Sequence, residues 1–285
     1  MLTCDAPVFS ARDLDEALSL RATFPDATVL AGGTDLMVGL ELGAVSPSRV
    51  LNLWGVRELR GVHGDATTGM RIGALTTFAD LARATGVPDA VAEMARTIGA
   101  AQIQARATVG GNLVNASPAG DSLPVWLALD AALELASVRG TRVVRAEAFF
   151  LGYRAVDLAP DELLTAVEVP AWSDGELADR LTYRKVGTRM AQSISKVVFS
   201  GRLRVRGGTV TQARLALGSV APTPIRLHGV EAALVGRPID PDVAEQVPLE
   251  IKPITDVRST AAYRSRVAHN IIRAWLHSER VAAGG

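Results

Sequence analysis

The spacing of apolar residues in the N-terminal part of the chain predicts short strands alternating with helices. Leu14, Ala17 and Leu18 share one face of a helix predicted over residues 9–20, and Ser10 is placed to cap its first turn, with Asp13 three residues on. Apolar runs predict strands at residues 27–33, 48–56 and 69–77. Helical periodicity predicts two further helices, at residues 77–84 and 89–99. The short connections indicate a mixed helix–strand fold.

The rest of the chain divides at a polar, turn-rich segment. A polar run at residues 108–124 lies between apolar segments that we interpret as strands, and further strands are predicted at 131–137, 141–149 and 161–170. Segment 171–180 is rich in turn residues, which predicts a domain boundary near residue 175. Beyond it, the spacing of Val267, Ile271, Ile272 and Trp275 predicts an amphipathic helix at the C-terminal end.

Composition narrows the class of protein. A chain of 285 residues predicts two or three structural units, because domains usually run to about 100–200 residues. The hydrophobic fraction of 48% and charged fraction of 21% are typical of a globular protein and argue against disorder. The formal net charge is zero, with no basic stripe, so nucleic-acid binding is not expected. Near-neutral charge is compatible with assembly into a larger complex.

Cysteine and histidine usage argues against metal chemistry. Cys4 is the single cysteine, which excludes an internal disulfide framework and a self-contained, cysteine-ligated iron–sulfur cluster. The four histidines show no metal-ligand spacing; they are His63, His228, His269 and His277. The sequence contains no apolar run of the length needed for a signal peptide or a membrane span, so we expect a cytoplasmic protein without membrane insertion.

The tripeptide Gly-Gly-Thr occurs twice, in two different settings. At residues 207–209 it joins two runs of alternating apolar and polar residues, which predicts a β-hairpin turn at Gly207 and Gly208. At residues 32–34 it follows an apolar strand and precedes a possible turn of helix, the layout of an anion-binding loop made of backbone N–H groups. A tight structural turn is the alternative. No Rossmann glycine fingerprint follows any predicted strand.

A second glycine-containing segment favours ligand binding over a simple turn. Residues 108–124, TVGGNLVNASPAGDSLP, concentrate glycine and small polar side chains between apolar elements. Two Gly-Gly loops can hold one extended diphosphate from both sides, and Asn112, Asn115 and Asp121 can bind ribityl, ribose or adenine groups. A plain surface loop is the alternative interpretation.

These two segments resemble known cofactor motifs. AGGTDLM and TVGGNLVNASPAGDS are similar to the FAD-binding motifs of the flavoprotein (medium) subunits of molybdenum hydroxylases, the family of xanthine dehydrogenase and aerobic carbon monoxide dehydrogenase. The resemblance extends in order over nearly the whole chain, through PDELLTAVEVP, RKVGTRMAQSISKV, LALGSVAPTPIR and DVRSTAAYRSRVAHNI. It implies an α+β, vanillyl-alcohol-oxidase (PCMH) type FAD-binding fold of two subdomains, about 1–55 and 56–175, followed by a C-terminal α+β domain, 176–285, that pairs a small antiparallel sheet with helices.

The resemblance also implies which residues bind FAD. The first loop would wrap the diphosphate with backbone amides, and the second would face it; these residues are Leu30, Ala31, Gly32, Gly33, Thr34, Asp35 and Leu36, and then Thr108, Gly110, Gly111 and Asn112. Asn115 and Asp121 would anchor polar parts of the cofactor. Ile98 and Leu164 would lie near the flavin or the adenine, and Lys185 would approach the edge of the flavin ring. Sequence alone would make Lys185 a solvated lysine.

The function implied is electron transfer within a complex. FAD would take electrons from a [2Fe–2S] cluster on a small partner subunit, while a large molybdopterin subunit oxidises the substrate, and the electrons would pass to NAD⁺ or another acceptor. The resemblance indicates no acid, base or nucleophile. Some relatives have a tyrosine over the flavin in the segment that matches GTRMAQSIS. This segment has no tyrosine here, so either Ile194 gates access to the flavin or nothing does. Two alternatives are a stand-alone flavin reductase of the same fold and a non-catalytic assembly subunit.

Overall fold

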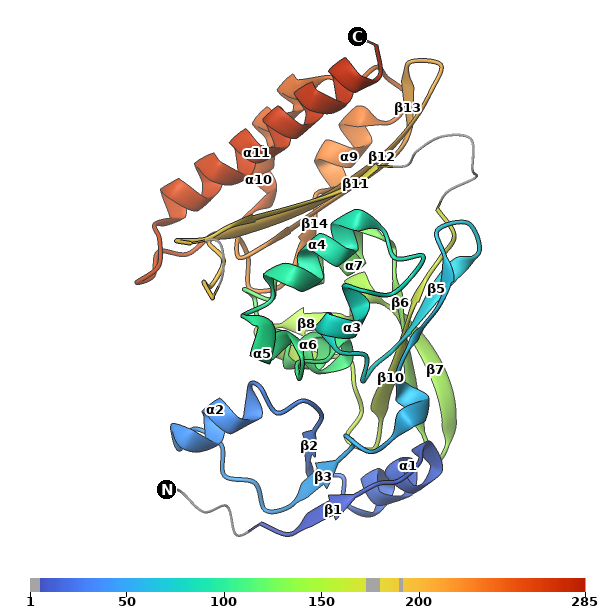
Figure 1. Cartoon of the computed structure of the whole chain (residues 1–285). Helices are drawn as coiled ribbons and strands as arrows, with labels where there is room; N and C mark the ends of the chain where they lie inside the picture. Colours follow the sequence, from blue (N-terminus) through green and yellow to red (C-terminus); the bar gives the residue numbers. More distant parts are fainter. Residues whose placement is uncertain (1–5, 173–179, 190–191, 285) are drawn as a thin grey trace.

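The computed structural model describes residues 6–172, 180–189 and 192–284. Figure 1 shows three units stacked along the molecule, each with its own sheet. The chain is mixed helix and strand throughout, in agreement with the predicted fold class. The boundary predicted near residue 175 falls outside the described residues.

The N-terminal unit is a three-stranded parallel sheet in the order β1-β3-β2, with α1 and α2 as its helices. Its elements are β1 (Val8–Ser10), α1 (Leu14–Thr23), β2 (Thr28–Leu30), α2 (Leu36–Glu41), β3 (Val50–Asn52) and η1 (Arg57–Leu59). Ala17 on α1 is fully buried in a cluster with Leu51 and Val56, as the apolar face predicted.

The predicted cap of α1 was wrong. Ser10 ends strand β1, and Asp13 caps the helix, since its side chain accepts a hydrogen bond of 2.8 Å from the N–H of Glu16. Asp13 has the extended backbone conformation of an N-cap residue. The Glu16 carboxylate also accepts a hydrogen bond from the backbone N–H of Arg12. The helix therefore begins four residues after Ser10, beyond the reach of its hydroxyl.

The middle unit is a five-stranded antiparallel sheet in the order β4-β5-β10-β6-β7. Its strands are β4 (Val62–Asp65), β5 (Gly69–Gly73), β6 (Ala132–Ser137), β7 (Gly140–Arg145) and β10 (Leu163–Val169), with a separate hairpin of β8 (Phe150–Gly152) and β9 (Ala155–Val156). Its helices are α3 (Phe78–Leu81), α4 (Asp89–Thr97), α5 (Ala101–Gln104), α6 (Val109–Asn115), α7 (Leu123–Ala128) and α8 (Ala146–Phe149). Phe78, Trp126 and Phe149 fill its core.

The interpretation of residues 108–124 as a loop between strands was wrong. The run contains helix α6 and the start of α7, and the apolar segment that follows it is helical. Thr108 caps α6 by accepting a 3.1 Å hydrogen bond from the N–H of Gly111, and Ala116 ends it in the left-handed conformation. All six residues of α7 are buried, so the segment has no polar face from which a helical period could be recognised.

The C-terminal unit is a four-stranded antiparallel sheet in the order β11-β12-β13-β14. Its elements are β11 (Arg180–Val186), β12 (Val197–Arg206), β13 (Thr209–Gly218), β14 (Ile225–Arg226), α9 (His228–Leu234), η2 (Pro241–Gln246), α10 (Val247–Glu250) and α11 (Ala261–Ala282). Gly207 and Gly208 form the turn between β12 and β13 with φ of +55° and +75°, which confirms the predicted hairpin.

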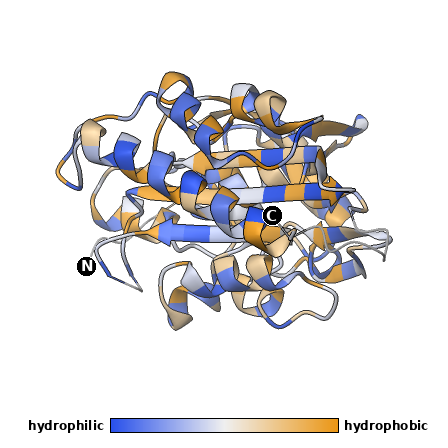
Figure 2. Ribbon diagram, turned by 90° about the horizontal axis from the view of Figure 1, so that it is seen from above, coloured by the Kyte–Doolittle hydropathy of each residue, from blue (hydrophilic) through white to orange (hydrophobic). Residues whose placement is uncertain are grey.

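Helix α11 confirms the predicted amphipathic C-terminal helix. Ile272 and Trp275 are buried against the sheet, and Trp275 packs edge-on against Phe199 of β12. Hydrophilic and hydrophobic positions alternate along this helix in Figure 2, as expected of a helix with one buried face. Helix α11 covers one face of the sheet, while α4 and α7 of the middle unit cover the other (Figure 1).

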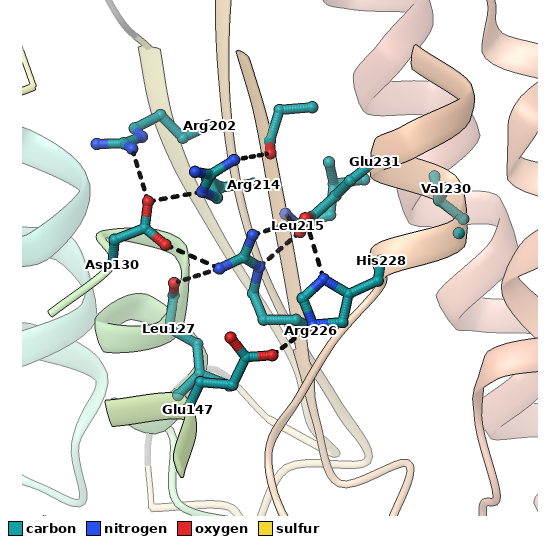
Figure 3. Close-up of polar contacts among 12 residues, drawn as sticks. Leu127, Asp130, Glu147, Arg202, Arg214, Leu215, Arg226, His228, Val230 and Glu231 are labelled. Carbon is teal, nitrogen blue, oxygen red and sulfur yellow. Dashed lines mark hydrogen bonds and ion pairs between the residues drawn. The ribbon is translucent and has the colours of Figure 1, made fainter. Parts of the chain in front are cut away.

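A cluster of charged residues lies where α7 meets the C-terminal sheet (Figure 3). The Asp130 carboxylate, directly after α7, lies 2.6 Å from Arg214, 2.9 Å from Arg226 and 3.5 Å from Arg202. Arg226 also forms two 2.6 Å hydrogen bonds with Glu231 on α9. The contacts between Asp130 and the three arginines fix the C-terminal unit on the middle one.

Candidate functional site

A cavity of about 440 Å³ lies between the N-terminal and middle units. Most of the residues predicted to bind the cofactor line it: Ala31, Gly32, Gly33, Thr34, Asp35, Leu36, Thr108, Gly110, Gly111, Asn112, Asn115 and Leu164. The two glycine motifs, far apart in sequence, therefore face one space. The cavity has the size and position usual for a small-molecule site, at the junction of two structural units.

The first loop, residues 30–36, presents unused backbone donors. Among the described residues, none accepts a hydrogen bond from the N–H groups of residues 32–36. The loop instead uses its carbonyls, since the N–H of Met37 donates to Gly33 O and that of Gly39 to Asp35 O. Gly33 has φ of +79°, a conformation that favours glycine. A run of unpaired N–H groups at a cavity is suited to an anion.

The second loop, residues 108–112, has the backbone N–H groups of residues 109–112 already engaged. The N–H of Val109 donates to Thr76 O at 3.0 Å, that of Gly110 to Ala74 O at 2.8 Å, and that of Asn112 to Thr108 O at 3.0 Å. What this loop offers the cavity is side chains. Asn112 Oδ1 accepts a 2.6 Å hydrogen bond from Ser122, which leaves its NH₂ group as the available donor.

Contacts within the protein explain the glycines of both loops. A Cβ on Gly32 would lie 1.8 Å from the backbone oxygen of Arg106, and one on Gly110 would lie 2.6 Å from Cβ of Ala74. The carbonyl of Gly32 also lies 3.4 Å from Nε of Arg106, whose guanidinium stacks on Trp54. Gly32 is therefore required where the first loop touches the segment that leads into the second.

Several predicted residues lie elsewhere. Leu30, Ile98, Asp121 and Lys185 are not among the described residues that line the cavity. Leu30 ends β2, and Ile98 caps the C-terminal end of α4. Ile194 is half exposed, while its neighbours Met190 and Ala191 lie outside the described residues. Whether these positions contact a cofactor stays a prediction.

Asp121 and Lys185 form a buried ion pair instead. Lys185 Nζ lies 2.6 Å from Asp121 Oδ2 and donates a 2.9 Å hydrogen bond to Thr97 O. Ser195 donates to the other oxygen of Asp121. Burial raises the pKa of Asp121, and Lys185 and Ser195 oppose that rise. Lys185 is thus not the solvated lysine that its sequence context alone suggests.

The apolar end of the cavity was missed by the sequence analysis. It is built from aliphatic side chains that read as ordinary core: Val29, Leu53, Leu59, Ala74, Leu75, Leu158 and Leu163. Arg21 and Glu162 are the ionisable residues there. Hydrogen bonds from Arg142 lower the pKa of Glu162, and Arg21 donates to Ala27 O at 2.7 Å. The sequence analysis identified only Leu164 in this region, next to the lining residue Leu163.

The donor set of the cavity suits binding more than acid–base chemistry. Asp35 is the third ionisable residue among the described lining residues, and its side chain is exposed. Among the described residues, no group of three His, Cys, Asp or Glu side chains is placed to hold a metal ion. None of the described helices has the length and apolarity to cross a membrane. Unpaired amides beside an apolar pocket fit a phosphorylated ligand with an aromatic ring.

Comparison with protein families identifies the ligand class. Residues 4–172 match the FAD-binding domain of molybdopterin dehydrogenases, and residues 182–278 match the C-terminal domain of carbon monoxide dehydrogenase flavoproteins. The chain belongs to the FAD-binding medium subunits of the xanthine and carbon monoxide dehydrogenase family. The resemblance inferred from its two motifs is confirmed, and so is FAD as the cofactor of the fold.

Individual relatives of this flavoprotein subunit cover almost its full length. It is 30% identical to the xanthine dehydrogenase FAD-binding subunit of Escherichia coli O157:H7, over 96% of each chain. It is 32% identical to the glyceraldehyde dehydrogenase medium chain of Sulfolobus acidocaldarius, over 92% of this chain and 94% of that one. A solved carbon monoxide dehydrogenase structure from Hydrogenophaga pseudoflava superimposes with a TM-score of 0.90 at 28% identity, covering 96% of each chain. The relatives are dehydrogenase subunits, so this chain is an oxidoreductase subunit.

Proposed function

We propose that this chain is the electron-transfer subunit of a molybdenum hydroxylase complex. It would bind FAD, receive electrons from a [2Fe–2S] cluster on a small subunit and deliver them to NAD⁺ or another acceptor, while a large molybdopterin subunit oxidises the substrate. The observation that carries the proposal is the run of unpaired amides at residues 32–36 beside an apolar cavity. Bound FAD would supply all of the redox chemistry.

The protein's part in this function is binding and exclusion of water. The amides of residues 32–36 would bind the diphosphate, and the amide of Asn112 would add a side-chain donor. The aliphatic end of the cavity would take the adenine ring, because it offers apolar contacts and few competing hydrogen bonds. We also propose that Leu30 belongs to the diphosphate loop, that Ile98 lies near the flavin or the adenine, and that Asp121 and Lys185 act at polar parts of the cofactor and at the flavin edge. We further propose a division into residues 1–175 and 176–285.

The single cysteine supports the dependence on partner subunits. A cluster held by cysteine thiolates needs several of them, so the iron–sulfur centre must reside on another chain. A stand-alone flavin reductase would need its own substrate acid, and the ionisable lining residues described above are engaged with backbone, with Arg142 or with solvent. We therefore favour the complex over that alternative.

The proposal is tested on the full chain, purified alone and with its co-expressed partners. We expect a yellow protein from which FAD is released and identified by chromatography, and a complex that also contains iron and molybdenum. In that complex, substrate should bleach the flavin absorbance and NAD⁺ should restore it if NAD⁺ is the acceptor. A colourless chain that does not take up added FAD would support an assembly subunit. A flavin chain that never associates with partners would support the stand-alone reductase.

A further inference from the structure

The turn between β8 and β9 brings a cation beside the cavity. Gly152 pairs with Ala155, so Tyr153 and Arg154 form the two residues of the turn. Nη1 of Arg154 donates a 3.0 Å hydrogen bond to Oδ1 of Asn115 and lies 3.8 Å from Oδ2 of Asp35. Asn115 and Asp35 both line the cavity, one from the middle unit and one from the N-terminal unit. The guanidinium therefore lies across the two units that enclose the cavity.

Most of the hydrogen-bonding capacity of Arg154 is available. Among the described residues, none accepts a hydrogen bond from its Nε or Nη2. The side chain as a whole is 47% exposed. A guanidinium presents its N–H groups in a planar fork that matches two oxygens of a phosphate. Arg154 can thus keep its contact with Asn115 and still bind an anion.

The charges around the first loop favour such a cation. Asp35 places a carboxylate among the amides of residues 32–36, and this carboxylate makes no capping hydrogen bond to α2. A diphosphate at these amides would be repelled by it. Arg106, the other arginine near the loop, has its guanidinium stacked 3.6 Å over the ring of Trp54. Arg154 is the cation placed to balance Asp35.

The backbone of Arg154 is strained. Its φ is +52°, in the left-handed region where a side chain costs folding free energy and glycine does not. Strained non-glycine residues of this kind cluster at ligand sites, where the side chain rather than the fold requires them. Nothing in the packing of the turn needs an arginine, because Tyr153 and Leu151 beside it are exposed as well.

We propose that Arg154 is a cofactor-binding residue that clamps the FAD diphosphate against the first loop. This inference rests on the proposed function, because it takes FAD as the ligand and the amides of residues 32–36 as its phosphate site. No sequence motif singled out this position. Asp35 opposes the clamp, since its carboxylate competes with the phosphates for the same guanidinium.

Arg154→Gly separates a binding role from a structural one. The full chain is stripped of cofactor and titrated with FAD, and binding is followed by quenching of flavin fluorescence. We expect an FAD Kd about 10- to 150-fold higher, the change that loss of one charge-assisted hydrogen bond of about 1.5–3 kcal/mol gives. The melting temperature without FAD should stay the same or rise, because glycine relieves the strained φ. A structural arginine would instead lower the melting temperature.

Matched variants sharpen the test. Asp35→Asn should tighten FAD binding by several-fold in the wild-type background, and also in the Arg154→Gly background, where no cation offsets the repulsion between this carboxylate and the diphosphate. Arg154→Gln should weaken the dependence of Kd on salt concentration, since one ionic contact is lost. Arg145→Gln, at an exposed pair 3.5 Å from Glu147 in the same unit, should change nothing.

The outcomes distinguish failure of the proposed function from failure of the Arg154 clamp alone. A wild-type chain that does not bind FAD contradicts the proposed function. A wild-type chain that binds FAD, with Arg154→Gly binding equally well or with Asp35→Asn binding more weakly, overturns the clamp alone. An Arg106→Gln variant that weakens binding while Arg154→Gly does not would transfer the role to Arg106.

Discussion

Lys185 Nζ lies 2.6 Å from Asp121 Oδ2, and this buried ion pair joins the C-terminal sheet to the segment between α6 and α7. The side chains are 6% and 11% exposed. Tyr183, two residues before Lys185 on the same strand, hydrogen-bonds Thr97 at 2.9 Å, and burial raises its pKa. The segment between α6 and α7 and the end of α4 are thereby tied to β11 through buried polar contacts.

Lys185→Met should destabilise the protein by about 3–5 kcal/mol, because it leaves the Asp121 carboxylate buried without its partner. The double variant, Asp121→Asn with Lys185→Met, should lose less unfolding free energy than the two single variants lose together, because it has no unpaired buried charge. Urea unfolding of each variant measures these differences. Lys252→Met, at an exposed lysine, is the control and should unfold like wild type. Equal stability of the two lysine variants would contradict a structural ion pair.

The cost of Lys185→Met should depend on pH. Burial raises the pKa of folded Asp121, so the folded protein binds this proton more tightly than the unfolded chain does. A group of this kind favours folding below its unfolded pKa and loses that contribution as pH rises through its folded pKa. The destabilisation should therefore be smaller at about pH 5 than at about pH 8. A pH-independent difference would mean that Asp121 stays ionised in the variant.

Gly32→Ala should separate the first loop from the Arg106 segment, because the new Cβ would lie 1.8 Å from a backbone oxygen that cannot move cheaply. We expect FAD affinity to fall by about tenfold or more, since displacement of a loop by about 1 Å disturbs several amides at once. Gly152→Ala is the matched control: its Cβ would lie 4.0 Å from Ala155 and its φ is not positive. Fluorescence titration compares the FAD affinities of the two variants. Equal affinities would show that the contact between Gly32 and Arg106 does not shape the site.

Arg226→Met should loosen the C-terminal unit. The side chain is 4% exposed and connects Glu231 to Asp130, so its loss removes the bidentate partner of Glu231 and one of the three arginines at Asp130. We expect a loss of about 3–5 kcal/mol and earlier hydrogen exchange in β13, β14 and α9 than in the middle unit. Arg145→Met, at a surface pair, should cost under about 1 kcal/mol. Uniform exchange in both variants would show that the cluster does not hold the units together.

Asp256→Asn should reveal a pH-dependent anchor of α11. Burial raises the pKa of Asp256, but hydrogen bonds from Arg258, Arg264 and Ser259 outweigh it and lower that pKa to about 2. A depressed pKa adds stability that is complete above the unfolded value of about 3.9 and is lost as pH falls through about 2. The difference in unfolding free energy between wild type and variant should thus be constant above about pH 5 and shrink below it. Asp242→Asn, at an exposed pair with Arg273, should show a small difference at every pH.

The sequence by itself determined the elements whose period or turn chemistry is local. The Gly207–Gly208 hairpin and helix α11 follow from residues within a few positions of one another, and so does strand β2 before the first loop. The two glycine motifs indicated the family and the cofactor, because their sequences are specific. This held although the second motif was interpreted as a loop and in fact contains a helix. Their shared cavity was predictable for the same reason.

Tertiary structure decided which side chains are buried and which meet. Helix α7 has apolar residues on every side because it packs between two units, so its period could not identify it. Asp121 and Lys185 are 64 positions apart, and Arg154 is 39 positions from Asn115. Contacts over such separations depend on how the sheets stack, and a local pattern carries no information about them. The sequence therefore specified the binding loops, while the tertiary structure determined which charged side chains lie beside them.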